Sequence, residues 1–330
     1  MYMLKLDPAR VQLDSVHAKD RIMGLDTVDA ISASHNAVAA INAGFFNTKN
    51  GDPASVLKIS GEFVSDATLA RGVVIINSPA TGKTSLEFDQ LSAKQELRFA
   101  NGGRTFVVPI DGVDTTRAIG KLMLYSPMYN ADSDTAPTGT EWVVKGKPLS
   151  AGEAHRNVGH TPIPKDGFVL SYGGTTLPAP LDRLAGATSI SIATNWVSKA
   201  GVSAAALDAA EHIVNGAGLL RRHGRSLTDW SAEALSTANF TEMRHPRTVI
   251  GVDEQGFIWL VAIDGRQPDR AVGMNFAELQ RLCDRLHITD ALNLDGGGST
   301  TMVVKGGIRN TPSDAAGPRP VGDALIVTLR

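Results

Sequence analysis

Residues 291–304 read ALNLDGGGSTTMVV, a glycine run between two apolar segments. The two flanks, residues 291–294 and 301–304, are short and apolar or β-branched, so we expect two buried strands there. Three consecutive glycines separate the flanks. Glycine lets the backbone take a positive φ or lets another group come close, at a cost of up to about 1 kcal/mol per residue relative to alanine. The run therefore predicts a tight loop in which another group uses the space.

The polar residues beside the glycines suit an anion or a sugar. Asp295 precedes the run, and Ser299 and Thr300 follow it, so a carboxylate, two hydroxyls and several backbone N–H donors share one concavity. A simpler interpretation is that Asp295-Gly296 opens an ordinary hairpin, since Asp-Gly is a strong hairpin signal. The run is not a P-loop, because no Lys follows, and its spacing is not that of a dinucleotide fingerprint.

Composition excludes several classes of protein. The chain has 330 residues, a net charge of −2 and 20% charged residues, so it carries no basic field to hold nucleic acid or an anionic membrane. A single cysteine, Cys283, rules out disulfides within the chain and a cysteine-based metal cluster, and its helical context predicts a small core residue. No apolar run is as long as a membrane span. The first residues indicate a strand rather than a signal peptide. We expect a secreted or periplasmic protein if a leader preceded this sequence, and a cytoplasmic one otherwise.

The fold class that we predict is α+β, a single large domain over residues 1–330 with mixed, mostly antiparallel sheets and a few packed helices. The chain is turn-rich, with 33 glycines and 16 prolines, so short strands should dominate. Hairpins are expected over residues 58–64 and 248–264, and loops and short strands of the same domain over residues 112–186. The connection over residues 273–288 is long enough for a parallel or crossed strand pairing.

Two helices have sequence signals at their starts. Residues 203–215 have helical spacing, with Ser203 in the capping position. Asn275 begins the second helix and has Glu278 three positions on, the pattern of a capping box.

Charged residues recur where the predicted strands end. Asp264 and Asp295 each follow a strand and precede a glycine, whereas Arg247, Arg266 and Arg319 lie in short loops or at strand starts. A turn carboxylate and a solvated guanidinium are the ordinary roles of such residues. Their joint occurrence beside glycine-rich turns favours a site with planar donors for phosphate and carboxylates for a sugar.

Other chemistries receive little support. No His-Glu-x-x-His array, Gly-x-Ser-x-Gly elbow or kinase signature is present, and the eight histidines are scattered. His155 and His160 share a loop, but isolated histidines are more often structural or exposed. No cofactor is required. A divalent cation such as Ca²⁺ fits Asp264 and Asp295 as oxygen ligands, although nothing spaces them like a recognised loop.

An ordered set of segments resembles the phosphodiester glycosidase family, and it covers nearly the whole chain. In this sequence the segments are residues 42–46, 213–220, 245–251, 264–266, 273–279, 293–301 and 310–321. Two positions depart from the family pattern. Ala43 replaces a glycine, and Pro318 stands where the family usually has Glu before Arg-Pro, which leaves Arg319 alone.

The resemblance implies hydrolysis of the glycosidic C–O bond in a sugar-1-phosphodiester of a glycan or the cell envelope, releasing sugar and a phosphomonoester. Such a leaving group, with a second pKa near about 6, needs little help from a general acid. Asp264, Asp295 and Arg266 are the catalytic candidates, with either aspartate as base or nucleophile unless a 2-acetamido group of the sugar attacks. The arginines and the amides of residues 296–299 would hold phosphate.

The residues implied in substrate binding come from four of these segments. They are Asn42, Gly44, Phe45, Arg247, Thr248, Asn293, Gly296, Gly297, Gly298, Ser299, Thr300, Asn310, Ser313 and Arg319.

Two alternatives remain open. One is a non-catalytic carbohydrate-binding protein of exopolysaccharide processing, and the other is a metal-dependent phosphodiesterase that cleaves P–O. The sequence carries no signal for an oligomeric state.

Overall fold

The computed structural model describes residues 1–65, 67–235 and 238–330, and these form four sheets. Strands make up 44% of the structure and helices 12%. The prediction of mostly antiparallel sheets with a few helices is confirmed. The chain is better described as β-rich than as α+β, because its helices are few and short.

The first sheet has six strands and contains the hairpin predicted over residues 248–264. In spatial order the strands are β1 (Tyr2–Leu6), β20 (Ile258–Ile263), β19 (Arg247–Asp253), β21 (Ile288–Asn293), β17 (Leu219–Arg222) and β18 (Arg225–Ser226). Strands β20 and β21 both pair antiparallel with β19, one on each side, so they run in the same direction. The predicted crossed connection is therefore present.

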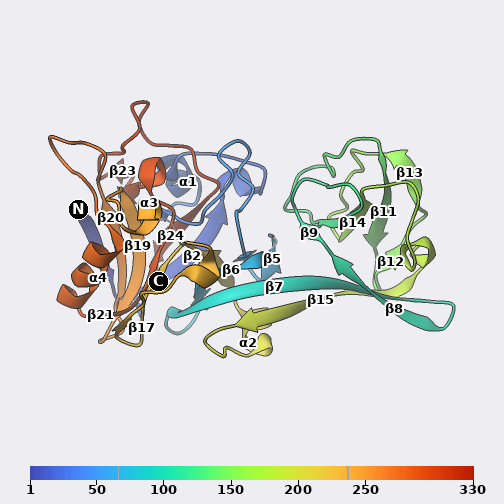
Figure 1. Cartoon of the computed structure of the whole chain (residues 1–330), viewed down its shortest axis with the longest axis horizontal. Helices are drawn as coiled ribbons and strands as arrows, with labels where there is room; N and C mark the ends of the chain where they lie inside the picture. The colour runs from blue at the N-terminus through green and yellow to red at the C-terminus, as the bar shows by residue number, and fades with distance from the viewer. Residues whose placement is uncertain (66, 236–237) are drawn as a thin grey trace.

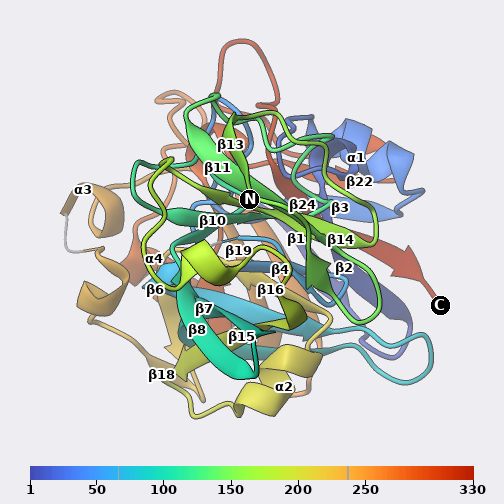
Figure 2. The same cartoon turned by 90° about the vertical axis from the view of Figure 1, so that its right-hand side faces the viewer.

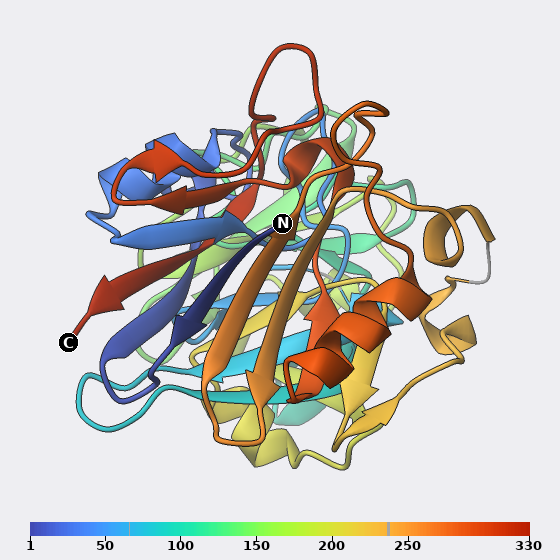
Figure 3. The same cartoon turned by 90° about the vertical axis from the view of Figure 1, so that its left-hand side faces the viewer.

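The helix in this connection begins at the predicted capping box. Helix α4 spans Phe276–Arg285, the Asn275 side chain accepts the Glu278 N–H, and the Glu278 carboxylate accepts the Asn275 N–H. Leu279 and Cys283 are buried against the first sheet, over which α4 lies in Figure 3. Cys283 is thus a core residue, as predicted.

The second sheet contains the strand that follows the triple glycine. Its strands, in spatial order, are β2 (Val11–His17), β24 (Asp323–Leu329), β3 (Ala39–Asn42), β22 (Met302–Val304) and β23 (Gly307–Ile308), and α1 (Val28–Ser34) packs on it. The glycines join β21 of the first sheet to β22 of the second through the 3-10 turn η4 (Gly297–Ser299). The hairpin interpretation of Asp295-Gly296 is therefore wrong, since its flanking strands belong to different sheets.

The third sheet has seven strands and corrects one helix prediction. The strands are β15 (Thr188–Ser198), β7 (Ser85–Asn101), β6 (Ala67–Asn77), β16 (His212–Asn215), β4 (Leu57–Ile59) and β5 (Glu62–Phe63), with β8 (Arg104–Ile110) also paired to β7. The hairpin over residues 58–64 is confirmed. Ser203 does cap a helix, α2, but α2 ends at Ala209. The rest of the predicted helix is β16, where β-branched Ile213 and Val214 are buried.

The fourth sheet forms a lobe of its own. Its strands are β9 (Gly112–Val113), β10 (Leu122–Tyr125), β11 (Gly139–Lys145), β12 (Ser150–Ala151), β13 (His155–Val158) and β14 (Gly167–Tyr172). Figure 1 shows this lobe to the right of the larger body, with β7 and β15 running between them, and Figure 2 views it end-on. Its core includes the fully buried Trp142. Strands β9 and β10 pair in parallel. A single domain over residues 1–330 stays a prediction.

The larger body has one core shared by three sheets. Leu13 of the second sheet, Ile76 of the third and Leu292 of the first are fully buried in the same cluster. The remaining short elements are η1 (Ala18–Asp20), η2 (Leu181–Arg183), η3 (Ser231–Glu233) and α3 (Ala238–Thr241). Within the described ranges, no helix is long and apolar enough to cross a bilayer.

Candidate active site

A cavity of about 190 Å³ lies beside the triple glycine, where strands of the first two sheets end. It is lined by Phe45, Phe240, His245, Pro246, Arg247, Arg266, Asn293, Asp295, Gly296, Gly297 and Arg319. Residues that are hundreds of positions apart in the chain therefore meet here, and most of the lining was nominated by the sequence. Phe240, His245 and Pro246 were not among the predicted site residues.

Each of the three glycines lets a different group come close. A Cβ on Gly296 would stand 2.6 Å from a backbone carbonyl oxygen of the neighbouring loop, and one on Gly297 would stand 2.9 Å from Nη1 of Arg266. A Cβ on Gly298 would overlap both the guanidinium of Arg319 and the carboxylate of Asp314. The space left by the missing side chains is thus taken by two guanidinium groups, a carboxylate and a backbone carbonyl.

The backbone amides of this turn are mostly used within the protein. The Gly296 N–H donates to Oδ1 of Asp295, the Gly297 N–H to the Pro246 carbonyl, and the Ser299 N–H to the Gly296 carbonyl. Three of the four amides predicted to hold phosphate are therefore paired within the protein, and phosphate binding by this turn stays a prediction. The guanidinium groups are the cationic donors that the cavity offers to an anion.

Arg319 is held by the carboxylate of Asp314, which was not among the predicted site residues. Its Nε lies 2.8 Å from Oδ2 of Asp314, and its Nη2 lies 3.2 Å from Oδ1. The expectation that Pro318 leaves Arg319 alone is wrong, because Asp314 supplies the partner from the preceding loop. A two-point contact of this kind fixes the plane of a guanidinium as well as its position.

Asp295 has a fixed backbone and a carboxyl group of unusual pKa. Removal from bulk water raises the pKa of this carboxyl to about 6, while the Ser299 hydroxyl, the Gly296 N–H and the charges of Arg319 and Arg266 act in the opposite direction. The residue still reaches the cavity and is partly accessible. A carboxyl group that titrates near neutral pH is suited to general acid–base work.

The backbone around Asp295 is tied to the end of β3. Nδ2 of Asn42 donates to the Asp295 carbonyl at 2.6 Å, and the Asp295 N–H donates to the Ala43 carbonyl at 3.0 Å. Oδ1 of Asn42 in turn accepts the Thr248 hydroxyl and the Thr301 N–H. Asn42 and Thr248 are fully buried, so here they position the turn rather than face the cavity.

Asp323 is a second buried carboxyl group, and no sequence signal marked it. Its Oδ1 accepts the Gly44 N–H at 3.0 Å, its Oδ2 has no partner, and Asn215 beside it accepts the Phe45 N–H at 2.9 Å. Burial raises the pKa of Asp323 to about 7; the Gly44 N–H opposes this shift, and the charge of Asp295 adds to it. The two side chains hold the loop that carries Phe45 into the cavity wall.

Arg247 lines the cavity but uses its donors on the protein. Its Nε donates to the Met274 carbonyl at 3.0 Å, and its Nη2 donates to the carbonyls of Phe240 and Met243 at 2.6 and 3.2 Å. Burial lowers the pKa of its guanidinium to about 10, and the charge of Arg266 adds to this effect. Arg247 therefore anchors α3 as the wall of the cavity.

Asp264 lies outside the cavity lining. Its Oδ1 accepts the Thr311 N–H at 3.0 Å and Nδ2 of Asn310 at 3.2 Å, and its Oδ2 is 4.0 Å from Nη2 of Arg270. These contacts fix the loop that leads to Asp314. Asp264 and Asp295, both predicted to be catalytic, thus have different surroundings. The other nominated residues outside the lining are Asn42, Gly44, Thr248, Gly298, Ser299, Thr300, Asn310 and Ser313.

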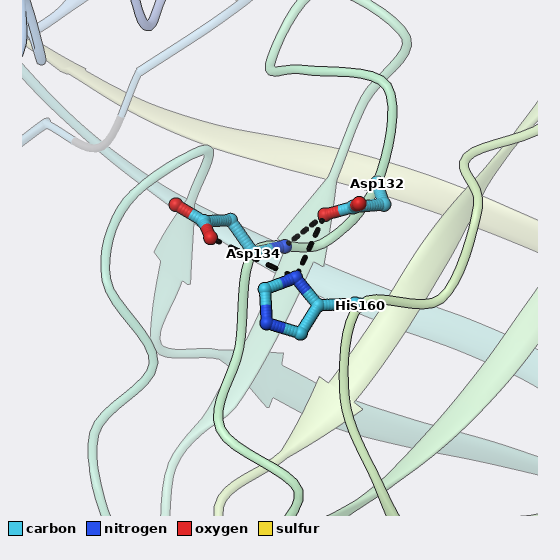
Figure 4. Close-up of side chains that lie close together, drawn as sticks. All are labelled: Asp132, Asp134 and His160. Carbon is cyan, nitrogen blue, oxygen red and sulfur yellow. Dashed lines mark hydrogen bonds and ion pairs between the residues drawn. The ribbon is translucent and has the colours of Figure 1, made fainter.

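A group of potential metal ligands lies away from this cavity. Within the described residues, one group of three His, Cys, Asp or Glu side chains lies close enough to share an ion, and it belongs to the fourth-sheet lobe. Nδ1 of His160 lies 3.3 Å from Oδ1 of Asp132 and 3.8 Å from Oδ1 of Asp134 (Figure 4). A divalent cation at Asp264 and Asp295 stays a prediction.

A small cavity that joins guanidinium groups to a carboxyl group of raised pKa is a candidate site for acid–base chemistry on an anionic ligand. The comparison with known families is specific. The chain belongs to the phosphodiester glycosidase family, whose profile matches residues 138–328.

Two curated relatives share a segment with this chain. It is 35% identical over 86 residues to the mouse N-acetylglucosamine-1-phosphodiester alpha-N-acetylglucosaminidase, and 33% identical over 102 residues to the human protein of that name. These matches cover 26% and 31% of this chain, but they span only 16% and 19% of the relatives.

Solved structures show the same fold over nearly the whole chain. A putative exported protein from Burkholderia pseudomallei K96243 is 25% identical, with a TM-score of 0.81 over 98% of this chain and 73% of that one. A hypothetical protein from Synechocystis is 23% identical, with a TM-score of 0.79 over 99% and 59%.

Proposed function

We propose that the protein hydrolyses the glycosidic C–O bond of a sugar-1-phosphodiester in a glycan or cell-envelope substrate, releasing the sugar and a phosphomonoester. The observation that carries the proposal is that Asp295, Arg266 and Arg319 line one cavity of about 190 Å³. The names of the curated relatives refer to N-acetylglucosamine-1-phosphodiesters, so we take N-acetylglucosamine as the first sugar to test.

The cationic groups act on the leaving group. Arg266 and Arg319 bind the phosphate and stabilise the charge that it gains as the C–O bond breaks. Arg319 enters this step already oriented by Asp314. Because a phosphomonoester is a good leaving group, the reaction needs no strong general acid on that side.

Asp295 acts on the sugar side, where it is ionised above about pH 6. In that form it either removes a proton from the attacking water or attacks the anomeric carbon itself. If the sugar carries a 2-acetamido group, that group attacks and Asp295 orients it. Asp264 is a positioning residue in this scheme, because its carboxylate holds the loop of Asn310 and Thr311.

Hydrolysis of N-acetylglucosamine-1-phospho-methyl diester in ¹⁸O-water tests the proposal. We expect the label in the released sugar and loss of turnover in Asp295→Asn. As a matched control, His160→Ala changes the potential metal ligands of the other lobe and should keep full turnover. Label in the phosphate would indicate P–O cleavage, and binding of the diester without any product would indicate a carbohydrate-binding protein. Either result would overturn the proposal.

A further inference from the structure

A second, larger cavity of about 430 Å³ lies on the other side of α3. Phe240 of α3 lines the first cavity, and the next two residues, Thr241 and Glu242, line the second. The start of α4 and the segment around Trp230 complete its wall. The two cavities are therefore neighbours separated by one short helix.

A row of aromatic rings joins the two cavities. Ring centroids lie 6.1 Å apart between Phe45 and Phe240, 5.6 Å between Phe240 and Phe276, and 4.9 Å between Phe276 and Trp230. Phe45 stands in the first cavity and Trp230 in the second. Phe45, Phe240 and Trp230 are partly exposed, so a ligand that extends from the first cavity toward the second can contact these three rings.

The charges of the two cavities are opposite. Three guanidinium groups line the first, those of Arg247, Arg266 and Arg319. The described lining of the second contains no Lys, Arg or His, and it includes two carboxylates, Asp229 and Glu242, together with hydroxyl and amide side chains. The first cavity therefore suits an anion, and the second suits a neutral group with many hydroxyls to donate.

The aromatic surface of the second cavity is that of a sugar platform. Trp230 is partly exposed, and its Nε1 donates to the Leu219 carbonyl at 2.8 Å, which holds the ring in place. Phe276 is only 1% exposed, so it supports Trp230 without offering a face of its own. One ring rimmed by hydrogen-bonding groups fits a pyranose, whereas a quaternary ammonium group is held by a cage of several rings.

We propose that the second cavity binds a neutral sugar residue of the aglycone, the part of the substrate beyond the phosphate. The inference rests on the proposed function. At about 190 Å³ the first cavity is smaller than the roughly 300–1,000 Å³ of typical ligand pockets, so it holds little more than the phosphate and one sugar ring. The aglycone must extend out of it, and the second cavity is its neighbour across α3.

Binding to the inactive Asp295→Asn protein tests the site without catalysis. The probes are maltose, mannobiose and chitobiose, followed by saturation-transfer NMR, and inorganic phosphate, followed by calorimetry. We expect at least one disaccharide to bind with a Kd of about 1–10 mM. Glu242→Gln and Trp230→Ala should each weaken it by roughly 2–10-fold, while Arg266→Ala should weaken only phosphate binding.

Several outcomes would overturn the subsite. The first is that none of the three disaccharides binds. The second is that the Trp230→Ala and Glu242→Gln variants bind a disaccharide as tightly as the parent Asp295→Asn protein does. The third is that choline displaces the bound sugar. Trp230→Ala removes a packed ring and can lower stability. Its melting temperature is therefore compared with that of Trp230→Phe, so that loss of binding is not confused with unfolding. Glu242 is exposed, and Glu242→Gln is the variant that leaves the fold unchanged.

Turnover separates this inference from the proposed function. The wild-type protein should hydrolyse a diester with a disaccharide aglycone at a kcat/KM about tenfold above that for a methyl aglycone, and Glu242→Gln should narrow the ratio. Turnover that is indifferent to the aglycone refutes the subsite and leaves the function standing. Disaccharide binding that Glu242→Gln weakens, without turnover of any diester, refutes the function and leaves a sugar site.

Discussion

Replacing Asp295 by Asn should stabilise the protein at neutral pH while removing its activity. The pKa of this carboxyl is raised from 3.8 to about 6 in the folded chain. Between these values the native state binds more protons than the unfolded state, so stability falls as pH rises through this window and is level above it. At about 1.4 kcal/mol per pKa unit, the ionised Asp295 destabilises the fold at pH 7 by roughly 3 kcal/mol.

An Asn side chain keeps an oxygen for the Gly296 N–H and carries no charge. Asp295→Asn should therefore gain up to about 3 kcal/mol at pH 7 and almost nothing near pH 4, where Asp295 is already largely protonated. Turnover should fall by about 10²–10⁴-fold, as expected when a general base is lost. In the wild-type protein, kcat/KM should decline below about pH 6, where the carboxylate is protonated.

Urea unfolding of both proteins near pH 4 and pH 7 measures the stability difference. The exposed Asp269→Asn is the matched control, and it should change neither midpoint. An Asp295→Asn protein that is less stable than wild type at pH 7, or whose stability difference is the same at both pH values, would refute the reasoning. Unchanged turnover would remove Asp295 from the catalytic step.

Three further predictions concern single positions. Gly297→Ala puts a side chain at φ +61° against Arg266, so the protein should lose about 1–2 kcal/mol of stability and most of its turnover. The control Gly306→Ala, at φ +71° with open space around it, should lose similar stability in thermal melting but keep its kcat/KM. Equal activity of the two variants would contradict this prediction. Asp264→Asn keeps an oxygen for its loop and should lose at most about tenfold in kcat; a loss as large as that of Asp295→Asn would return Asp264 to a catalytic role. Burial raises the pKa of the Cys283 thiol to about 12, so iodoacetamide should label Cys283 at pH 8 only after denaturation. Mass spectrometry measures the labelling, and prompt labelling of the native protein would contradict the burial.

Local signals predicted local structure well. The Asn275 and Glu278 pair marked the start of α4, and the turn between β19 and β20 was readable because the residues that form these features are neighbours in the chain. The turn at Asp295-Gly296 shows the limit. The same dipeptide opens a hairpin or a crossover, and the choice depends on which strands are already paired elsewhere.

The site was partly predictable for the same reason. A position at a strand end nominated both Asp264 and Asp295, but the direction in which each carboxylate faces depends on how the loop of Asn310 and Thr311 packs. Asp314 and Asp323 carried no local signal. Their roles arise only when Arg319 and the Gly44 N–H are brought to them.

The bonds that close the cavity also say when activity can appear during refolding. Asn42 and Asp295 are 253 positions apart, and Gly44 and Asp323 are 279 apart. Contacts between such distant positions form late, because the intervening chain must first be ordered. The strand pairs β1–β20 and β2–β24 join positions about as far apart, so turnover after dilution from denaturant should return only with the last of the β-structure. Enzyme activity therefore reports the completion of folding.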